Sequence, residues 1–317
     1  MKKFFKNIKK NIKYLLEYFF TLIVLKILGT FGIDKSVQIC RCIARKIGPL
    51  LPVNKIAKEN VQNIFGKNQT NGLSMETQAT INQVWDNFGS FIGEFPYVNK
   101  MSEEELSKRV EISGLDNIIE FQKSHQPFLL FTGHFANWDF ALKIINKFYP
   151  KFAIIYRKLN NPYIDKLIND TRKTSNIKLI PKGEKGARYL ISAIKSGYAI
   201  GMLVDQKMNN GIEVPFLDQP AMTAHAIAKI ALQFGYPIIP LQVVRTSNNS
   251  YFKAIIHPPI QLQKTNNSKT DCYNIMFTIN QILGNWVKEN PGQWFWFHNR
   301  WKKNNYAPND KICNNNM

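Results

Sequence analysis

From residue 128 onward, short apolar runs alternate with amphipathic stretches. The runs are four to eight residues long and rich in β-branched or aromatic residues, as is typical of buried strands: 128–133, 152–157, 177–180, 198–204, 237–244 and 251–257. Between them, apolar residues recur at helical spacing in 138–148, 162–174, 185–196 and 223–234. Strands that alternate with helices are joined by crossovers, so the sequence predicts an α/β fold with a largely parallel central sheet covered by helices.

Helical patterns also flank the alternating region. Residues 36–66 and 74–99 are expected to be helical, with proline and glycine breaks, and a last helix is expected near 270–289. For the helix at 223–234, Thr223 is a candidate N-cap and Gly235 a candidate stop.

The length of 317 residues allows one large domain or two modest ones, and 44% hydrophobic residues can form a large core. The sequence shows no internal repeat past residue 35. We therefore expect a basic N-terminal segment and a single domain that has a helical lead-in, an α/β core and a frayed Asn-rich tail: 1–35, then 36–317 divided into 36–109, 110–302 and 303–317.

The N-terminus joins a lysine cluster to a long apolar segment. "MKKFFKNIKKNIK" holds six Lys in thirteen residues, and residues 14–33, "YLLEYFFTLIVLKILGTFGI", are about as long as a bilayer-spanning helix. Glu17 and Lys26 interrupt the segment, and each costs about 2.5–3.5 kcal/mol at a bilayer centre. No small-residue cleavage site follows. We expect a membrane-anchoring helix, which either spans once or lies in the interface, with a buried core helix as the alternative.

The net charge of +20 favours acidic partners, such as nucleic acid, anionic lipid or an acidic protein. Only eight of the 42 basic residues are Arg in a chain rich in Lys, Asn and Ile, so part of the charge reflects composition. No recognised nucleic-acid module is present, and a nucleic-acid partner is not expected. A basic, membrane-tethered binding protein without catalysis stays open as an alternative.

The four cysteines are too few and too scattered for a disulfide framework, which favours reduced thiols in a protein that faces the cytoplasm: Cys40, Cys42, Cys272 and Cys313. The sequence contains neither a Gly-rich phosphate loop nor a cluster with metal-ligand spacing. We therefore expect no metal and no organic cofactor.

The stretch "FTGHFANWDF", residues 131–140, connects a predicted strand to a predicted helix. It places His134 on the loop and Asp139 in the first helical turn, with Asn137 as a candidate N-cap. Ligands of open α/β sheets bind beyond the carboxyl ends of strands, where this loop lies. A carboxylate that binds one imidazole nitrogen leaves the other free as a base. The alternative is a loop histidine satisfied by backbone and an acid favoured by the helix dipole.

Several further stretches carry a family resemblance: "VWDNFGSFIGEF" (84–95), the run 110–140, "IYRKLNNPYID" (155–165), the block 197–240 and "WFWFHNRWK" (294–302). In this order they resemble the late acyltransferases of lipid A biosynthesis, the lauroyl and myristoyl transferases of Gram-negative bacteria. That family shares an HxxxxD/E motif and a fold with the glycerolipid acyltransferases. The chain departs from the family at Lys158, where Pro is usual, and at Asn299, where Arg is common.

The resemblance implies transfer of a fatty acyl group from acyl carrier protein to the 3-hydroxyl of an acyl chain on a lipid A precursor. A secondary alcohol is a poor nucleophile, so His134 would take its proton as general base while Asp139 orients the ring. The implied partners are acyl carrier protein, the lipid A precursor and anionic lipids of the inner membrane, with the catalytic domain on the cytoplasmic face. Another membrane lipid or a glycolipid stays open as the acceptor.

The candidates for binding substrate are six polar residues: Arg157, Asp205, Gln206, Arg188, His298 and Arg300. Arg157 ends a predicted strand and could bind the oxyanion or a lipid A phosphate, with a surface salt bridge as the alternative. Asp205 and Gln206 end another strand at the same sheet edge, where Gln206 either positions substrate or fastens the loop 207–220. Arg188 and Arg172 could contact a phosphate or lie on solvated helix faces, and His298 and Arg300 could contact substrate or belong to an aromatic core.

Overall fold

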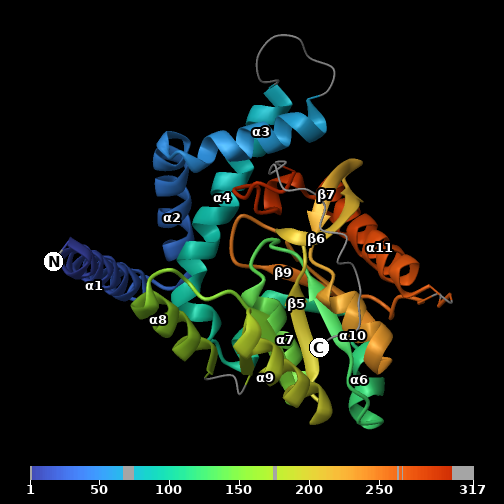
Figure 1. Ribbon diagram of the computed structural model, residues 1–317. Coiled ribbons are helices and arrows are strands. Elements are labelled where there is room, and N and C mark those ends of the chain that lie inside the picture. Colours follow the sequence, from blue (N-terminus) through green and yellow to red (C-terminus); the bar gives the residue numbers. More distant parts are fainter. Residues whose placement is uncertain (1, 67–74, 174–176, 263, 266, 302–317) are drawn as a thin grey trace.

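The computed structural model describes residues 2–66, 75–173, 177–262, 264–265 and 267–301, so the predicted frayed tail 303–317 lies outside the described residues. Its centre is a seven-stranded sheet in the order β1-β9-β8-β2-β5-β3-β4 (Figure 1). The strands are β1 (Val110–Ser113), β2 (Leu129–Thr132), β3 (Phe152–Tyr156), β4 (Lys178–Pro181), β5 (Ala199–Leu203), β8 (Ile238–Arg245) and β9 (Phe252–Ile256). All neighbouring pairs are parallel except β8–β9, which confirms the predicted α/β fold with a largely parallel sheet.

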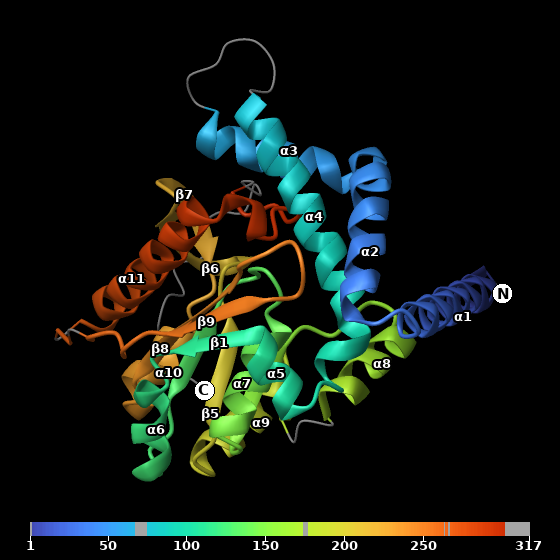
Figure 2. The same cartoon turned by 180° about the vertical axis from the view of Figure 1, so that it is seen from behind.

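Helices cover both faces of the sheet and form a separate N-terminal group (Figures 1 and 2). In chain order they are α1 (Lys2–Leu28), α2 (Ile33–Ile47), η1 (Gly48–Leu50), α3 (Val53–Phe65), α4 (Met75–Val98), α5 (Glu103–Arg109), α6 (Asp116–Lys123), α7 (Asp139–Phe148), α8 (Pro162–Lys173), α9 (Glu184–Lys195), α10 (Ala226–Phe234), α11 (Ser268–Glu289) and η2 (Pro291–Gln293).

Strand β2 shows why the central strands are apolar throughout. All four of its residues are buried. Leu129 and Phe131 join the core cluster that includes α10 and α11, whereas Leu130 joins the cluster that includes α6 and α7. Successive side chains of a strand point to opposite faces, so a sheet covered on both sides needs apolar residues at every position.

The sequence did not predict the hairpin of β6 (Lys207–Phe216) and β7 (Gln219–Thr223), which occupies the expected loop 207–220. Its two-residue turn, Leu217 and Asp218, has φ of 50° and 60°, as in the turns that suit the twist of paired strands. Neither turn residue is glycine, so the usual signal was missing. The predicted N-cap Thr223 is wrong: it ends β7, and α10 starts after His225. The predicted stop at Gly235 is confirmed by its φ of 70°.

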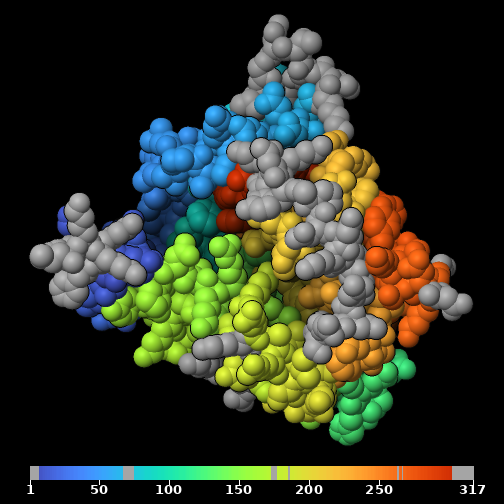
Figure 3. Space-filling model, viewed as in Figure 1, coloured from blue at the N-terminus to red at the C-terminus, as the bar shows by residue number. Residues whose placement is uncertain are grey.

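The N-terminal helices attach to the core through α4. Helix α2 packs closely along it because Gly89 and Gly93 have no side chains: a Cβ on Gly93 would lie 2.7 Å from the Ser36 carbonyl oxygen. Helix α1 lies at the edge of the molecule next to α8 (Figure 3), where Asn161 Nδ2 donates to the Tyr14 carbonyl and to Glu17, each at 2.9 Å.

Much of the apolar surface of α1 remains exposed, including Leu16, Phe19, Phe20, Ile23 and Ile27. None of the described helices has the length and apolar character that a membrane crossing requires.

Candidate active site

His134 lies on the loop between β2 and α7, at the carboxyl edge of the sheet. Two backbone hydrogen bonds join this loop to the segment after α11: Phe295 N–H donates to the His134 carbonyl at 3.0 Å, and Ala136 N–H to the Gln293 carbonyl at 2.9 Å. Phe135 and Trp294 form an antiparallel bridge between the same segments. The loop is therefore held on the sheet by chain far away in sequence.

The imidazole of His134 is hydrogen-bonded to Asp205, the second residue after β5. His134 Nδ1 lies 2.7 Å from Asp205 Oδ1, and the His134 backbone N–H donates to Asp205 Oδ2 at 2.7 Å. Trp294 Nε1 donates to the same Oδ2 at 2.7 Å. These three hydrogen bonds fix the orientation of both the carboxylate and the ring.

Asp205 is completely buried. Burial would raise the pKa of this carboxyl, but the positive charge and hydrogen bonds of His134 outweigh it and hold the pKa of Asp205 well below its usual range. An ionised carboxylate only accepts hydrogen bonds, so His134 Nδ1 carries the proton and Nε2 keeps its lone pair when the ring is neutral. Gln206 Nε2 lies 3.3 Å from that Nε2 and can donate to it.

The predicted bond between His134 and Asp139 is wrong in this structure, because Asp205 occupies Nδ1 and Asp139 points elsewhere. Asp139 is the first residue of α7, and its Oδ1 accepts from Arg172 Nη2 at 2.9 Å. The Asp139 backbone N–H donates to Asn137 Oδ1 at 3.1 Å, so Asn137 caps the helix start although Trp138 holds the N-cap position. The centroid of the Trp138 ring lies 4.8 Å from that of His134.

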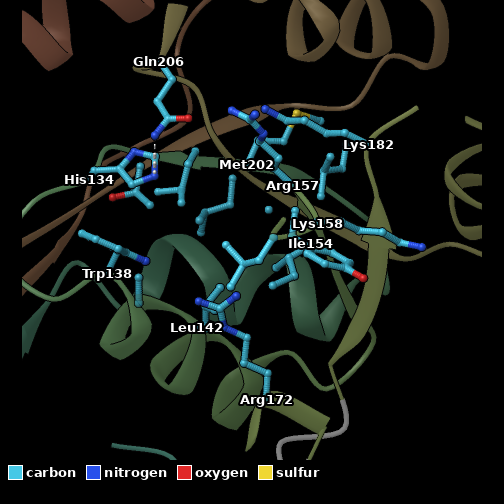
Figure 4. Close-up of a pocket in the computed structure, with 18 of the residues that line it drawn as sticks. His134, Trp138, Leu142, Ile154, Arg157, Lys158, Arg172, Lys182, Met202 and Gln206 are labelled. Carbon is cyan, nitrogen blue, oxygen red and sulfur yellow. Dashed lines mark hydrogen bonds between the residues drawn. The ribbon is translucent and has the colours of Figure 1, made fainter. Parts of the chain in front are cut away.

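A cavity of about 430 Å³ opens beside His134 (Figure 4). Its apolar lining includes Leu130, Ala141, Leu142, Ile154, Ile155, Met202 and Leu203. In Figure 4, His134 and Gln206 lie together on one side, and Arg157 and Lys182 lie next to each other on the neighbouring wall. Arg172 lies below Leu142 in this view. The cavity thus combines a histidine, an apolar body and a basic rim.

Four basic residues line the cavity: Arg157, Lys158, Arg172 and Lys182. Lys182 keeps contact with solvent, but partial desolvation, followed by the charge of Arg157, lowers its pKa. Only Arg172 among them forms an ion pair with a described residue. Among the described residues, the other three have no ion-pair partner, and positive charges gathered without counter-charges favour an anionic ligand.

Arg300 and Arg188, both predicted to bind substrate, lie outside the lining of this cavity. Arg300 is fully buried and donates to the Met222 carbonyl at 2.9 Å and to Thr223 Oγ1 at 2.8 Å, so it fastens the β6–β7 hairpin. Arg188 is exposed on α9 outside the lining. Neither side chain lines this cavity, because residue type and position in the sequence carry no information on which way a side chain points; contact of either residue with substrate stays a prediction.

Of the remaining candidates, Arg157 and Gln206 line the cavity, and Asp205 lies behind His134 instead of contacting the cavity. Sequence reasoning missed Trp138, which lines the cavity next to His134, and Lys182. Trp138 lies in the same stretch as His134, residues 131–140, and this proximity in sequence could have indicated it. Lys182 follows β4, the last strand of the sheet order, which sequence alone could not place.

His298 packs against the rings of Trp294 and Phe295, with centroids 5.3 Å and 6.3 Å away. Neither ring nitrogen has a hydrogen-bond partner among the described residues. Burial lowers the pKa of His298 to about 4, although Asp205 opposes the shift. It is therefore a neutral part of the aromatic core behind the site.

His298 should make the fold sensitive to acid. His298 binds a proton near pH 6.5 in the unfolded chain but only near pH 4 in the folded chain. The contribution of neutral His298 to the free energy of unfolding is therefore fully present above pH 6.5 and is lost as the pH falls towards 4. The loss should reach about 3 kcal/mol. Urea unfolding at pH 7.5 and 4.5 should show a smaller difference for His298→Phe than for wild type. Equal differences would exclude His298 as a source of acid sensitivity.

Comparison with known proteins gives one family and one structural neighbour of note. A family model described as "Bacterial lipid A biosynthesis acyltransferase" matches residues 1–303. The crystal structure of the 1-acyl-sn-glycerophosphate (LPA) acyltransferase PlsC from Thermotoga maritima is 12% identical, with a TM-score of 0.39, and the match covers 79% of this chain and 99% of that chain. No curated protein sequence matches the chain.

Proposed function

The chain belongs to the bacterial lipid A biosynthesis acyltransferases, and from that membership we propose the finer activity. It transfers a fatty acyl group from the thioester of acyl carrier protein to a hydroxyl on an acyl chain of a lipid A precursor. The observation that carries this proposal is the His134–Asp205 pair beside an apolar cavity with a basic rim.

In the proposed reaction, the acceptor hydroxyl approaches His134 Nε2, the nitrogen that Asp205 leaves free. His134 takes the hydroxyl proton as the oxygen attacks the thioester carbonyl carbon. The C–S bond then breaks, and the imidazolium returns its proton to the departing thiolate. Ionised Asp205 stabilises the imidazolium between these two transfers.

The rest of the cavity suits the two substrates. Its aliphatic walls match a fatty acyl chain, which is transferred from water into an apolar site at a gain of about 0.8 kcal/mol per CH₂. Gln206, at 3.3 Å from His134 Nε2, can position the incoming hydroxyl. Arg157 can bind the oxyanion or a phosphate of the acceptor.

Two measurements test the function directly. Purified chain should transfer a radiolabelled acyl group from acyl carrier protein to a lipid A precursor, and lipid A from a strain without the chain should be lighter by one acyl group in mass spectrometry. Wild type should restore the mass, and His134→Ala should not. Acylation of a lysophospholipid in place of the precursor would move the acceptor assignment to another membrane lipid.

Arg157→Lys should not behave as a conservative change. A guanidinium binds phosphate or carboxylate with two parallel hydrogen bonds, which an ammonium cannot reproduce. A charge-assisted hydrogen bond contributes about 1.5–3 kcal/mol, so kcat/KM for the acceptor should fall roughly 10- to 150-fold. The value for the acyl donor should change much less. A lysine variant with wild-type kinetics at varied acceptor and saturating donor would leave Arg157 as a surface charge.

We also propose that α1 anchors the protein at the cytoplasmic face of the inner membrane. The support is its six lysines within the first thirteen residues and its exposed aliphatic and aromatic side chains. Lysines attract anionic headgroups while apolar side chains enter the acyl boundary. The acceptor is itself a membrane lipid, so an anchor of this kind places the cavity near its substrate.

The variant Leu16→Ser/Phe20→Ser/Ile23→Ser should bind anionic vesicles at least tenfold more weakly in sedimentation, because burial of each side chain contributes about 1.5–3 kcal/mol. These side chains are 57–69% exposed, so the fold should be unaffected. A matched control is Tyr273→Ser/Phe277→Ser, which removes an exposed apolar pair from α11. Equal loss in both variants, or none in the first, would refute the anchor.

A further inference from the structure

The aspartate of the HxxxxD stretch has a partner other than the catalytic histidine. Asp139 binds Arg172, and Arg172 lines the cavity. We propose that Asp139 is a positioning residue for Arg172, and that Arg172 binds a phosphate group of the acceptor inside the cavity. This inference rests on the proposed function and adds a second substrate contact to it.

The ion pair joins two helices at the cavity. Asp139 is the first residue of α7, and Arg172 lies in the last turn of α8. The side chains are 4% and 17% exposed, and Arg172 Nη2 lies 2.9 Å from Asp139 Oδ1. A carboxylate at a helix N-terminus is stabilised by the helix dipole, so Asp139 is a stable acceptor for a cation.

Arg172 is held in place but not saturated. Its buried Nε has no hydrogen-bond partner among the described residues, and its guanidinium makes one hydrogen bond within the described part of the chain, to Asp139. A buried polar group without a partner is costly, which favours a ligand that supplies acceptors. Because Asp139 restricts the long side chain beforehand, less conformational entropy is lost when a ligand binds.

The charge around the cavity identifies the class of ligand. Asp139 balances Arg172, but Arg157, Lys158 and Lys182 have no ion-pair partner among the described residues. The lining contains no acidic residue in the described part of the chain. A phosphate group fits this surplus and matches the planar donor geometry of arginine. It could come from a sugar phosphate of the acceptor or from the phosphodiester of the donor's prosthetic arm, and we assign the acceptor.

The alternative is that Asp139 orients His134 during the reaction. The two roles predict different kinetics. A group that orients the base affects kcat and its pH profile, whereas one that positions a binding residue affects the KM of one substrate. Asp205→Asn provides the reference for a change at the histidine, because Asp205 contacts the ring directly.

The experiment is a double-mutant cycle of Asp139→Asn and Arg172→Met, with acceptor and donor varied separately. Arg172→Met should raise KM for the acceptor roughly 10- to 150-fold and leave KM for the donor unchanged. Asp139→Asn should raise the same KM by less, and the double variant should match Arg172→Met alone. The pH profile of kcat should stay at its wild-type position in all three, and Arg172→Lys should recover part of the affinity.

Each contrary result has one meaning. Multiplied losses in the double variant, or a displaced pH profile for Asp139→Asn, would assign Asp139 to His134 and overturn the inference. A raised donor KM would place the phosphate on the donor arm. If Arg172→Met also impaired an acceptor lacking its phosphates, no phosphate contact would exist. These tests require an active wild type, so failure of the proposed function would be seen separately, as no transfer to the precursor.

Discussion

Replacing His134 with alanine should abolish acyl transfer while the protein stays folded. General-base catalysis by a positioned side chain contributes roughly 10²–10⁴-fold, so kcat should fall by about that factor at saturating substrates. The fold should survive because Asp205 keeps two of its donors, the His134 backbone N–H and Trp294 Nε1. Acyl transfer should be measured together with thermal unfolding.

His125→Asn is the matched control for this variant. His125 is exposed, lies outside the cavity lining and has φ of 52°, a conformation that asparagine tolerates. It should keep wild-type turnover. If His134→Ala retained a tenth of wild-type activity, the general-base role would be wrong.

Asp205→Asn should also cause a large loss, of roughly 10²–10⁴-fold in kcat. An amide cannot stabilise the imidazolium, and its NH₂ group can reverse the tautomer of His134 by donating to Nδ1. The pKa of Asp205 lies below its usual range, so its carboxylate is ionised at neutral pH. Protonation of Asp205 is therefore not expected to limit wild-type activity there. The variant should therefore lose activity at every pH between 6 and 9.

Asp139→Asn is the informative comparison for Asp205→Asn, since both remove one buried carboxylate charge near the loop. A greater loss of kcat for Asp139→Asn than for Asp205→Asn would contradict the assignment of Asp205 as the orienting carboxylate. Removing one partner of a buried ion pair can cost about 3–5 kcal/mol of stability. Circular dichroism is therefore needed to check that both variants are folded.

The sequence predicted the fold well where periodicity and length were both informative. The six predicted strands agree with β2, β3, β4, β5, β8 and β9, and the helices between them with α7 to α10 to within a few residues. β1 was missed because four residues beside a helix carry little pattern. The β6–β7 hairpin was missed because its turn lacks glycine or asparagine, and polar strand residues such as Asn209 and Asn210 read as loop.

The sequence indicated where the site lies, but not which of its side chains contact each other. The end of β2 and the end of β5 were expected at one sheet edge, and these strands are neighbours, with Thr132 opposite Leu203. That register brings His134 and Asp205 together. The choice between Asp139 and Asp205 depends on side-chain direction at the start of α7, which Arg172 determines from another helix. Sequence spacing contains no information about such a contact.

The segment 293–296 has a consequence for how the enzyme matures. The last strand of the described sheet ends at Ile256, yet the His134 loop receives its backbone hydrogen bonds from Gln293 and Phe295, and Asp205 receives its third donor from Trp294. During synthesis, a nascent chain would therefore contain all strands of the described sheet, and both His134 and Asp205, before these hydrogen bonds could form. The site should therefore become competent only after residues 293–296 have been added, later than the strands and the two side chains that it joins.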